Sequence, residues 1–253
     1  MKVAYFDCPS GAAGDMIMAS LVDAGVDVTA LCAELAKLPL RGWELTAREV
    51  RKGAFRATKV DVEVNREAHR HHRSLRDILE ILERSTLGAS VKERASRIFT
   101  RLADAEARVH GVERETVRFH DVGAVDAIID VTGGVIALDL AHVEAVHVSA
   151  LPIGGGLVGG PHGRIPIPGP GTAELLRGFP VVDTGVRAEL VTPTGAAILT
   201  TLAASAGRMP SLTVDAVGYG AGTMDLPAAL LSRGDVDGRR GRRDRAAGRD
   251  DDR

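Results

Sequence analysis

The order of apolar and polar residues at the start of the chain predicts a strand followed by a helix. Residues 2–7 form a short apolar run that ends at Asp7, and residues 9–14 form a glycine-containing turn. Apolar residues at helical spacing follow this turn. A strand, a tight turn and a helix in this order are the opening of an α/β layer.

Two strand-like segments predict a β-hairpin. Residues 43–50 and 55–64 flank Lys52-Gly53, which is suited to a turn. In the second segment valines alternate with charged residues, Lys59 among them. This period of two is typical of a strand with one buried face, and it places Lys59 on the polar face.

Further helices and strands follow from the same reasoning. Ser74 and Asp77 predict a capping box at the start of one helix, and Ser90 and Glu93 predict another at the start of a helix that stops at Gly111. The remaining predicted helices cover residues 27–38, 123–140, 173–176 and 195–204, and the remaining predicted strands cover residues 145–149 and 212–217.

These elements predict one α/β domain layered around a mixed sheet, and a mixed α+β arrangement fits the same pattern. We assign residues 1–227 to this domain. Residues 228–253 differ: between Arg233 and Arg253 lie eight arginines and six aspartates, with Val236 as the only large aliphatic residue. Such a segment buries too little apolar surface to offset its ordering entropy, so we expect a disordered C-terminal tail.

Composition narrows the classes of function. A net charge of −2 gives no ground for a nucleic-acid partner, and no run reaches the roughly 18 apolar residues that a membrane helix needs. Cys8 and Cys32 are too few for a disulfide framework, and an acid at position 7 comes too soon for a signal peptide. We therefore expect a cytoplasmic protein without nucleic-acid or membrane partners. The oligomeric state stays open, a homo-oligomer included.

The first candidate site is the glycine turn between the initial strand and helix. Free N–H groups at a helix N-terminus bind anions such as phosphate, which suggests this role for Ser10, Gly11 and Gly14. Asp7 ends an apolar strand and is a candidate metal ligand. Asp15 is either a second ligand or a residue that favours the helix dipole. No Lys-Ser/Thr pair follows the glycines, so the turn is not a Walker A loop.

A second candidate site is the histidine cluster formed by His69, His71 and His72. Imidazole groups suit Ni²⁺ or Zn²⁺. A solvated basic loop explains the same residues equally well, and the sequence lacks the paired cysteines of structural zinc sites.

The strongest candidate for a metal or phosphate–metal site lies around the start of the 123–140 helix. His120 and Asp121 precede this helix, and Asp126 and Asp130 lie one turn apart on a face of small residues. Two acids buried there would be costly without a cation or a basic partner. Asp121 could also be a simple N-cap.

Two further segments could contact an anionic ligand. His162 and Arg164 lie in a Gly/Pro-rich stretch that fits an extended cover strand equally well. Thr192, Thr194 and Gly195 lie at a predicted helix start, where they either cap the helix or bind a phosphate.

These motifs together resemble the LarC family of nickel-insertion proteins over roughly residues 1–227. Full-length members of that family continue into a further domain associated with CTP binding, whereas here the similarity ends near Leu226-Pro227. We expect the tail to come from out-of-frame translation, by programmed frameshifting or sequencing error. The six matching motifs, in the same order as in the family, are Phe6 to Met16, residues 69–72, Phe119 to Asp126, Pro161 to Pro170, Glu189 to Gly195 and Gly218 to Thr223.

The resemblance implies a nickel chelatase, a cyclometallase of the lyase class. Such proteins install Ni²⁺ into pyridinium-3,5-bisthiocarboxylic acid mononucleotide, using CTP with a divalent cation (Mg²⁺ or Mn²⁺). The product is the nickel-pincer cofactor of enzymes such as lactate racemase. Activity would then need the downstream domain, and an apo-enzyme would receive the product.

On this interpretation each candidate residue acquires a hypothetical role. The histidine cluster collects Ni²⁺, while His120 with Asp126 and Asp130 holds it or takes the substrate's proton. The glycine-rich turns at 11–14 and 192–195 bind phosphate. One alternative is a non-catalytic nickel carrier or scaffold. A weaker alternative is a metal-dependent phosphohydrolase that uses Asp7, Asp15 and Asp126.

Overall fold

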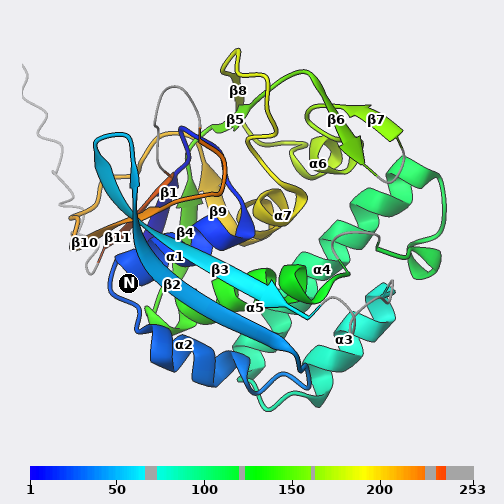
Figure 1. The fold of residues 1–253 in the computed structure, drawn as a ribbon, viewed down its shortest axis with the longest axis horizontal. Coiled ribbons are helices and arrows are strands. Elements are labelled where there is room, and N and C mark those ends of the chain that lie inside the picture. The colour runs from blue at the N-terminus through cyan, green and yellow to red at the C-terminus, as the bar shows by residue number, and fades with distance from the viewer. Residues whose placement is uncertain (66–72, 120–122, 161–162, 226–231, 238–253) are drawn as a thin grey trace, which may run out of the picture.

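The computed structural model describes residues 1–65, 73–119, 123–160, 163–225 and 232–237 (Figure 1). Its strands are β1 (Val3–Asp7), β2 (Trp43–Lys52), β3 (Phe55–Val64), β4 (Ala145–Val148), β5 (Leu151–Ile153), β6 (Leu157–Gly160), β7 (Gly163–Pro166), β8 (Val181–Asp183), β9 (Ala203–Ala206), β10 (Ala216–Gly220) and β11 (Ser232–Asp237). Its helices are α1 (Gly14–Asp23), α2 (Val28–Leu35), α3 (Leu75–Arg84), α4 (Ala89–His110), α5 (Val125–Leu140), α6 (Pro170–Leu175) and α7 (Pro193–Leu202), with a short 3₁₀ helix at Arg114–Thr116.

The main sheet is mixed and has seven strands in the order β2-β3-β10-β11-β1-β4-β9. β1, β4 and β9 run parallel to one another, whereas β11 runs antiparallel to both of its neighbours. Two smaller sheets pair β5 with β8 and β6 with β7. The predicted α/β class with a mixed sheet is confirmed.

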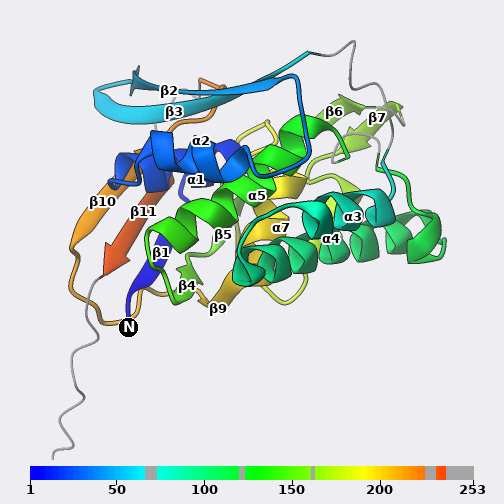
Figure 2. The ribbon, with the colours of Figure 1, turned by 90° about the horizontal axis from the view of Figure 1, so that it is seen from below.

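The predicted hairpin is the pair β2 and β3, aligned from Trp43 opposite Val64 to Lys52 opposite Phe55. Both ribbon views show the hairpin crossing over α1 (Figure 2). A long edge hairpin of this kind brings charged residues of its strands close to helices that precede it in the sequence.

Two of the predicted helix start and stop signals are confirmed, and one start signal is wrong. Ser74 forms the predicted capping box with Asp77, and Gly111 ends α4 in the left-handed conformation with a φ of 64°. The predicted capping box at Ser90 is wrong, because α4 begins at Ala89, with Gly88 as an N-cap that offers no side chain. Ser90 therefore lies inside the first turn.

Two predicted boundaries near the C-terminal half also shift. The helix expected to reach residue 204 ends at Leu202, and the chain continues directly as β9. The strand expected at 212–217 forms at 216–220 instead, because its pairing with β11 begins at Ala216. Both shifts result from strand pairing in the sheet, which cannot be predicted from the spacing of apolar residues within one segment.

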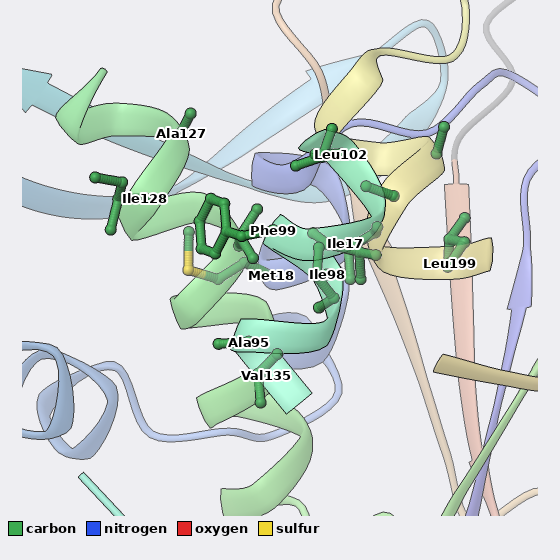
Figure 3. Close-up of a cluster of buried hydrophobic side chains, with 14 of the residues drawn as sticks. Ile17, Met18, Ala95, Ile98, Phe99, Leu102, Ala127, Ile128, Val135 and Leu199 are labelled. Atoms are coloured by element: carbon green, nitrogen blue, oxygen red, sulfur yellow. The ribbon is translucent and has the colours of Figure 1, made fainter. Parts of the chain in front are cut away.

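Helices α1, α4, α5 and α7 contribute to one buried core, shown in Figure 3. Phe99 of α4 and Met18 of α1 are completely buried, and Leu199 of α7 is too. Gly133 of α5 makes room for α1, since a Cβ there would lie 2.5 Å from the Met18 sulfur atom. Aliphatic side chains and close helix contacts thus form most of this core, since only 3% of the residues in the chain are aromatic.

Helices α1, α5 and α7 run in the same direction and begin on the same side of the molecule. Gly14 of α1 lies against Asp130 of α5, and one turn later Met18 lies against Gly133. Gly195 in the first turn of α7 lies against the segment that leads into α1. Because α1 follows the carboxyl end of β1 after a short loop, all three N-termini gather near that edge of the sheet.

The last described segment corrects the expectation for the C-terminal tail. β11, at 232–237, lies inside the range expected to be disordered, yet it pairs with β1 on one side and β10 on the other. Backbone hydrogen bonds to two neighbours order a strand even where apolar side chains are few. Residues 238–253 of the expected tail lie outside the described residues.

A search of the described residues for helices that are both long and apolar enough to cross a membrane finds none.

Candidate functional site

The glycine turn after β1 packs directly on the segment that leads into α7. The Ala12 N–H donates to the Leu190 carbonyl oxygen at 2.9 Å, and the Thr192 N–H donates to the Ala12 carbonyl oxygen at 3.0 Å. A Cβ at Gly11 would lie 2.0 Å from the Leu190 carbonyl oxygen, and a Cβ at Gly195 would lie 2.3 Å from that of Ala12. Only glycine fits at such distances, so two of the sequence motifs form one structural unit.

Helices α1 and α7 both begin at this unit. Thr192 caps α7, since its Oγ1 accepts from the Gly195 N–H at 3.2 Å and lies 3.0 Å from the Thr194 Oγ1. Ala13, the N-cap of α1, offers no side-chain oxygen, and the Gly14 N–H has no acceptor in the described part of the chain. Free first-turn N–H groups are suited to an anion.

Ser10 adds a hydroxyl group beside the start of α1. The residue is 8% exposed, and its Oγ has no hydrogen-bond partner among the described residues. A buried hydroxyl group without a partner is unfavourable, and a ligand or a water molecule would satisfy it.

Asp7 and Cys8 follow one another at the end of β1 but differ in burial. Asp7 is partly buried, and Cys8 is fully buried, with its N–H donating to the Ser149 Oγ at 3.0 Å. Burial, then the charge of Asp7, raises the pKa of the Cys8 thiol to about 12. The thiol therefore stays protonated and is a poor metal ligand or nucleophile.

Asp130, in the second turn of α5, lies against the first turn of α1. A Cβ at Gly14 would lie 2.8 Å from the Asp130 Cβ and 3.2 Å from its Oδ2. Burial, and then the charges of Asp15 and Asp126, hold the pKa of the Asp130 carboxyl well above its usual range, while Lys59 acts in the opposite direction. Within the described ranges no N–H or O–H group donates to this carboxyl group.

Lys59 of β3 is the residue of this group that sequence reasoning missed. It is 6% exposed, and its Nζ lies 3.0 Å from the Asp61 Oδ1, 3.1 Å from the Thr223 Oγ1 and 3.5 Å from the Asp15 Oδ2. The prediction that Lys59 lies on a solvated polar face is wrong, because α1 and the loop after β10 cover it. No local signal in the strand marks such a residue, since its partners are remote in sequence.

Asp15 and Asp126 differ in their surroundings. Asp15 is partly buried: burial raises its pKa above the usual value of 3.8, although Lys59 and the Met16 N–H, which donates to its Oδ1 at 2.9 Å, favour the charged form. Asp126 lies in the first turn of α5 and is exposed. The predicted one-turn spacing from Asp126 to Asp130 is confirmed. Of the two, Asp130 packs against Gly14 of α1, whereas Asp126 is exposed.

The histidines predicted as metal ligands or ligand contacts lie outside the described residues, as does Asp121. Among the residues that the structure does describe, no three His, Cys, Asp or Glu side chains are arranged to hold a metal ion. The histidines in question are His69, His71, His72, His120 and His162.

The described residues that border two of these segments do contact one another. The Phe119 N–H donates to the Arg73 carbonyl oxygen at 3.1 Å, and the Arg73 Nη1 donates to the Gly123 carbonyl oxygen at 2.9 Å. The described residue that follows the first segment therefore lies beside the two described residues that flank the second. Arg164, on β7, is exposed, and the structure gives it no hydrogen bond or ion pair with the residues above.

A comparison with protein families matches residues 4–235 to the nickel insertion protein family. The chain belongs to this family. Curated relatives named as candidate nickel insertion proteins are 50% identical over 228 residues in Geotalea uraniireducens, 44% over 233 residues in Dictyoglomus thermophilum and 49% over 236 residues in Gloeobacter violaceus. No solved structure matches the chain.

The alignments with these nickel insertion proteins cover 89%, 92% and 92% of this chain but 58%, 60% and 56% of the relatives. The chain thus spans less than two thirds of their length. The family match also extends to residue 235 and so includes most of β11.

Proposed function

We propose that this chain is the N-terminal part of a nickel chelatase that inserts Ni²⁺ into pyridinium-3,5-bisthiocarboxylic acid mononucleotide. Membership of the nickel insertion protein family supports the metal, and the resemblance to LarC proteins supports the substrate. The reaction would use CTP with Mg²⁺ or Mn²⁺, take place in the cytoplasm, and deliver the nickel-pincer cofactor to an apo-enzyme. The downstream domain of the longer relatives would supply the CTP-dependent part.

The observation that carries the proposal is the Asp130 carboxyl group beside the start of α1. Insertion breaks a pyridinium C–H bond: its electron pair forms the carbon–nickel bond, and its proton passes to a base. A carboxyl group whose pKa is raised by burial and by the charges of Asp15 and Asp126 is a stronger base near neutral pH than an ordinary aspartate. We assign this role to Asp130, with His120 and Asp126 as further catalytic candidates.

The phosphate group of the substrate is assigned to the unit formed by the starts of α1 and α7. Two helix N-termini place partial positive charge there, and the glycines let a ligand approach the backbone closely. The Ser10 hydroxyl group, which has no hydrogen-bond partner in the described part of the chain, is compatible with the same assignment. The ligand-binding candidates are Ser10, Gly11, Gly14, Thr192, Thr194 and Gly195, together with His162 and Arg164.

Nickel is the cargo of this reaction, and we assign its capture to His69, His71 and His72. Asp7, Asp15, His120 and Asp126 are the further ligand candidates. Of the four, Asp15 is the least suited, because a metal ion would have to displace the Lys59 ammonium group from it.

Asp130→Asn tests the assignment of the base, with Asp139→Asn as the matched control. Asp139 lies on the same helix but is exposed. We expect Asp130→Asn to lower the insertion rate roughly 10²-fold or more and Asp139→Asn to leave it unchanged. The assay combines this chain, the downstream domain of a longer relative, Ni²⁺, CTP and the substrate, and detects the metallated product by mass spectrometry.

Other outcomes of this assay lead to other conclusions. A wild-type rate in Asp130→Asn would remove Asp130 as the base. Tight nickel binding by the wild-type protein without any product would identify a nickel carrier instead of a chelatase.

A further inference from the structure

The ammonium group of Lys59 joins three elements at the end of α1 where the candidate site lies. It contacts Asp15 in the first turn of α1, Asp61 on β3 and Thr223 after β10. A buried ammonium group is unfavourable unless several partners surround it, so this placement requires all three contacts to compensate.

A second polar network already connects the same three elements farther along α1. Asp23 of α1 accepts hydrogen bonds from Arg56 and Thr58 of β3 and from the Tyr219 N–H of β10. Asp23 lies eight residues after Asp15, which is about 12 Å along the helix. The hairpin is therefore attached to α1 even without Lys59. The two networks differ in their neighbours, because only the one at Lys59 lies beside the candidate site.

Beside Lys59 lies the Asp15 carboxyl group, and Asp130 lies against Gly14, the residue that precedes Asp15 on α1. Asp130 has no hydrogen-bond donor among the described residues, and the absence of a side chain at Gly14 lets it approach the first turn of α1. The Lys59 ammonium group lies against Asp15, whereas among the described residues the Asp130 carboxyl group has no fixed partner of its own. Such a group is available to a substrate.

We propose that Lys59 is a positioning residue, which holds Asp15 toward β3 and Thr223 so that Asp130 alone of the two acids faces the substrate. This inference rests on the proposed function, since Asp130 is assigned there as the base. It adds a residue, Lys59, whose sequence context resembles an ordinary surface strand. Thr223, the last residue of the Gly218–Thr223 motif, also has a role, because its hydroxyl group accepts a hydrogen bond from the Lys59 ammonium group.

The test compares Lys59→Met, Lys59→Arg and Lys52→Met in the insertion assay. Lys52 is the matched control, because it lies on the same hairpin and pairs with the exposed Asp225. We expect Lys59→Met to lower kcat roughly 10²-fold, since displaced catalytic groups cost this much, and to leave KM within about twofold. Lys59→Arg should recover most of kcat, and Lys52→Met should match the wild type.

A second readout does not depend on activity. ¹³C NMR of the Asp130 carboxyl carbon should show a higher titration midpoint in Lys59→Met, because Lys59 favours the charged form of Asp130. Lys52→Met should not move it. If the wild-type protein inserts no nickel, the proposed function fails, and this NMR comparison still decides whether Lys59 acts on Asp130.

Three results would overturn the role of Lys59: a wild-type kcat in Lys59→Met, a loss confined to KM, or an unmoved midpoint for Asp130. If Lys59→Met does not fold, Thr223→Val takes its place, because it removes only the hydroxyl group that holds the ammonium. We then expect a several-fold loss of kcat, and a wild-type kcat would contradict the proposal.

Discussion

Asp23 shows how one buried carboxylate residue joins three elements. Its side chain is 2% exposed and accepts from the Arg56 guanidinium at 2.6 and 3.1 Å, the Thr58 hydroxyl at 2.7 Å and the Tyr219 N–H at 2.8 Å. Burial alone would raise its pKa, but the hydrogen bonds from Arg56, Tyr219 and Thr58 outweigh burial and lower it. The fold therefore stabilises the ionised form.

Asp23→Asn should lower the free energy of unfolding by about 1–3 kcal/mol at neutral pH, because charged hydrogen bonds are lost. A lowered pKa in the folded state stabilises the protein fully above the ordinary value of 3.8 and progressively less as the pH falls through the folded-state value. The difference between mutant and wild type should therefore shrink in acid. Urea unfolding at neutral and acid pH measures it.

The control for this experiment is Asp225→Asn. Asp225 pairs with Lys52 but is 86% exposed, so its replacement should change stability by less than about 0.5 kcal/mol. An Asp23→Asn deficit that keeps its full size in acid would contradict the assignment to charge.

Cys8 should resist alkylation in the folded protein. The residue is 1% exposed and its pKa is raised to about 12, so almost no thiolate is present at pH 8. Cys32, which is only partly buried, should react first with iodoacetamide. Peptide mass spectrometry before and after unfolding in guanidinium chloride measures both sites. Rapid modification of Cys8 in the native protein would show that β1 opens easily.

For single residues, the sequence predicts the spacing of side chains along a helix well, but it predicts poorly which other residues surround them. Asp126 and Asp130 belong to one helix, so their one-turn separation follows from helix geometry. That Asp130 is partly buried and Asp126 is exposed depends on Gly14, more than a hundred residues earlier in the chain. The burial of Lys59 likewise depends on Asp15 and Thr223, whose approach no periodicity in β3 reports.

Between elements, the closest contact in this part of the fold is that of α1 with β10. A Cβ at Gly218 would lie 1.9 Å from the Ser20 carbonyl oxygen, and a Cβ at Gly220 would lie 2.0 Å from that of Met16. The glycines of the Gly218–Thr223 motif therefore let a helix and a strand approach each other directly. This packing sets the position of Thr223 relative to α1.

Gly220→Ala should destabilise the protein by about 1–3 kcal/mol, because the added methyl group forces α1 and β10 apart. Thermal unfolding followed by circular dichroism measures the loss. Gly155→Ala is the control: a Cβ there would meet no atom within 4 Å, so we expect a change within about 0.5 kcal/mol. Equal stabilities for the two variants would mean that the α1–β10 contact adjusts freely.

Elements whose signals are local were predicted, and those defined by pairing were not. The β2–β3 hairpin and the long helix α4 each carry their own period of apolar residues. β11 does not, since its strand character comes from hydrogen bonds to β1 and β10, and the strand at β10 was predicted with shifted bounds. A segment as polar as 232–237 cannot be recognised as a central strand before its neighbours are known.

For the molecule as a whole, β11 closes the sheet between β1 and β10. Without it, β1 and β10 would each expose a row of unpaired backbone groups. We expect a chain shortened to residues 1–231 to lose cooperative thermal unfolding and to aggregate. A chain shortened to residues 1–237 should unfold like the full chain. Identical unfolding curves for the two truncated chains would show that β11 contributes nothing to the stability of the fold.

The antiparallel course of β11 also fixes where any following polypeptide must start. Asp237 lies opposite Val3, at the amino end of β1, while the glycine turn and Asp130 gather beyond Asp7 at its carboxyl end. The length of β1 alone separates the two edges by about 13 Å. A domain attached after β11 therefore begins at the amino end of β1, opposite the candidate site, and it can act at that site only through a connecting segment of at least about four extended residues that leads back along the molecule.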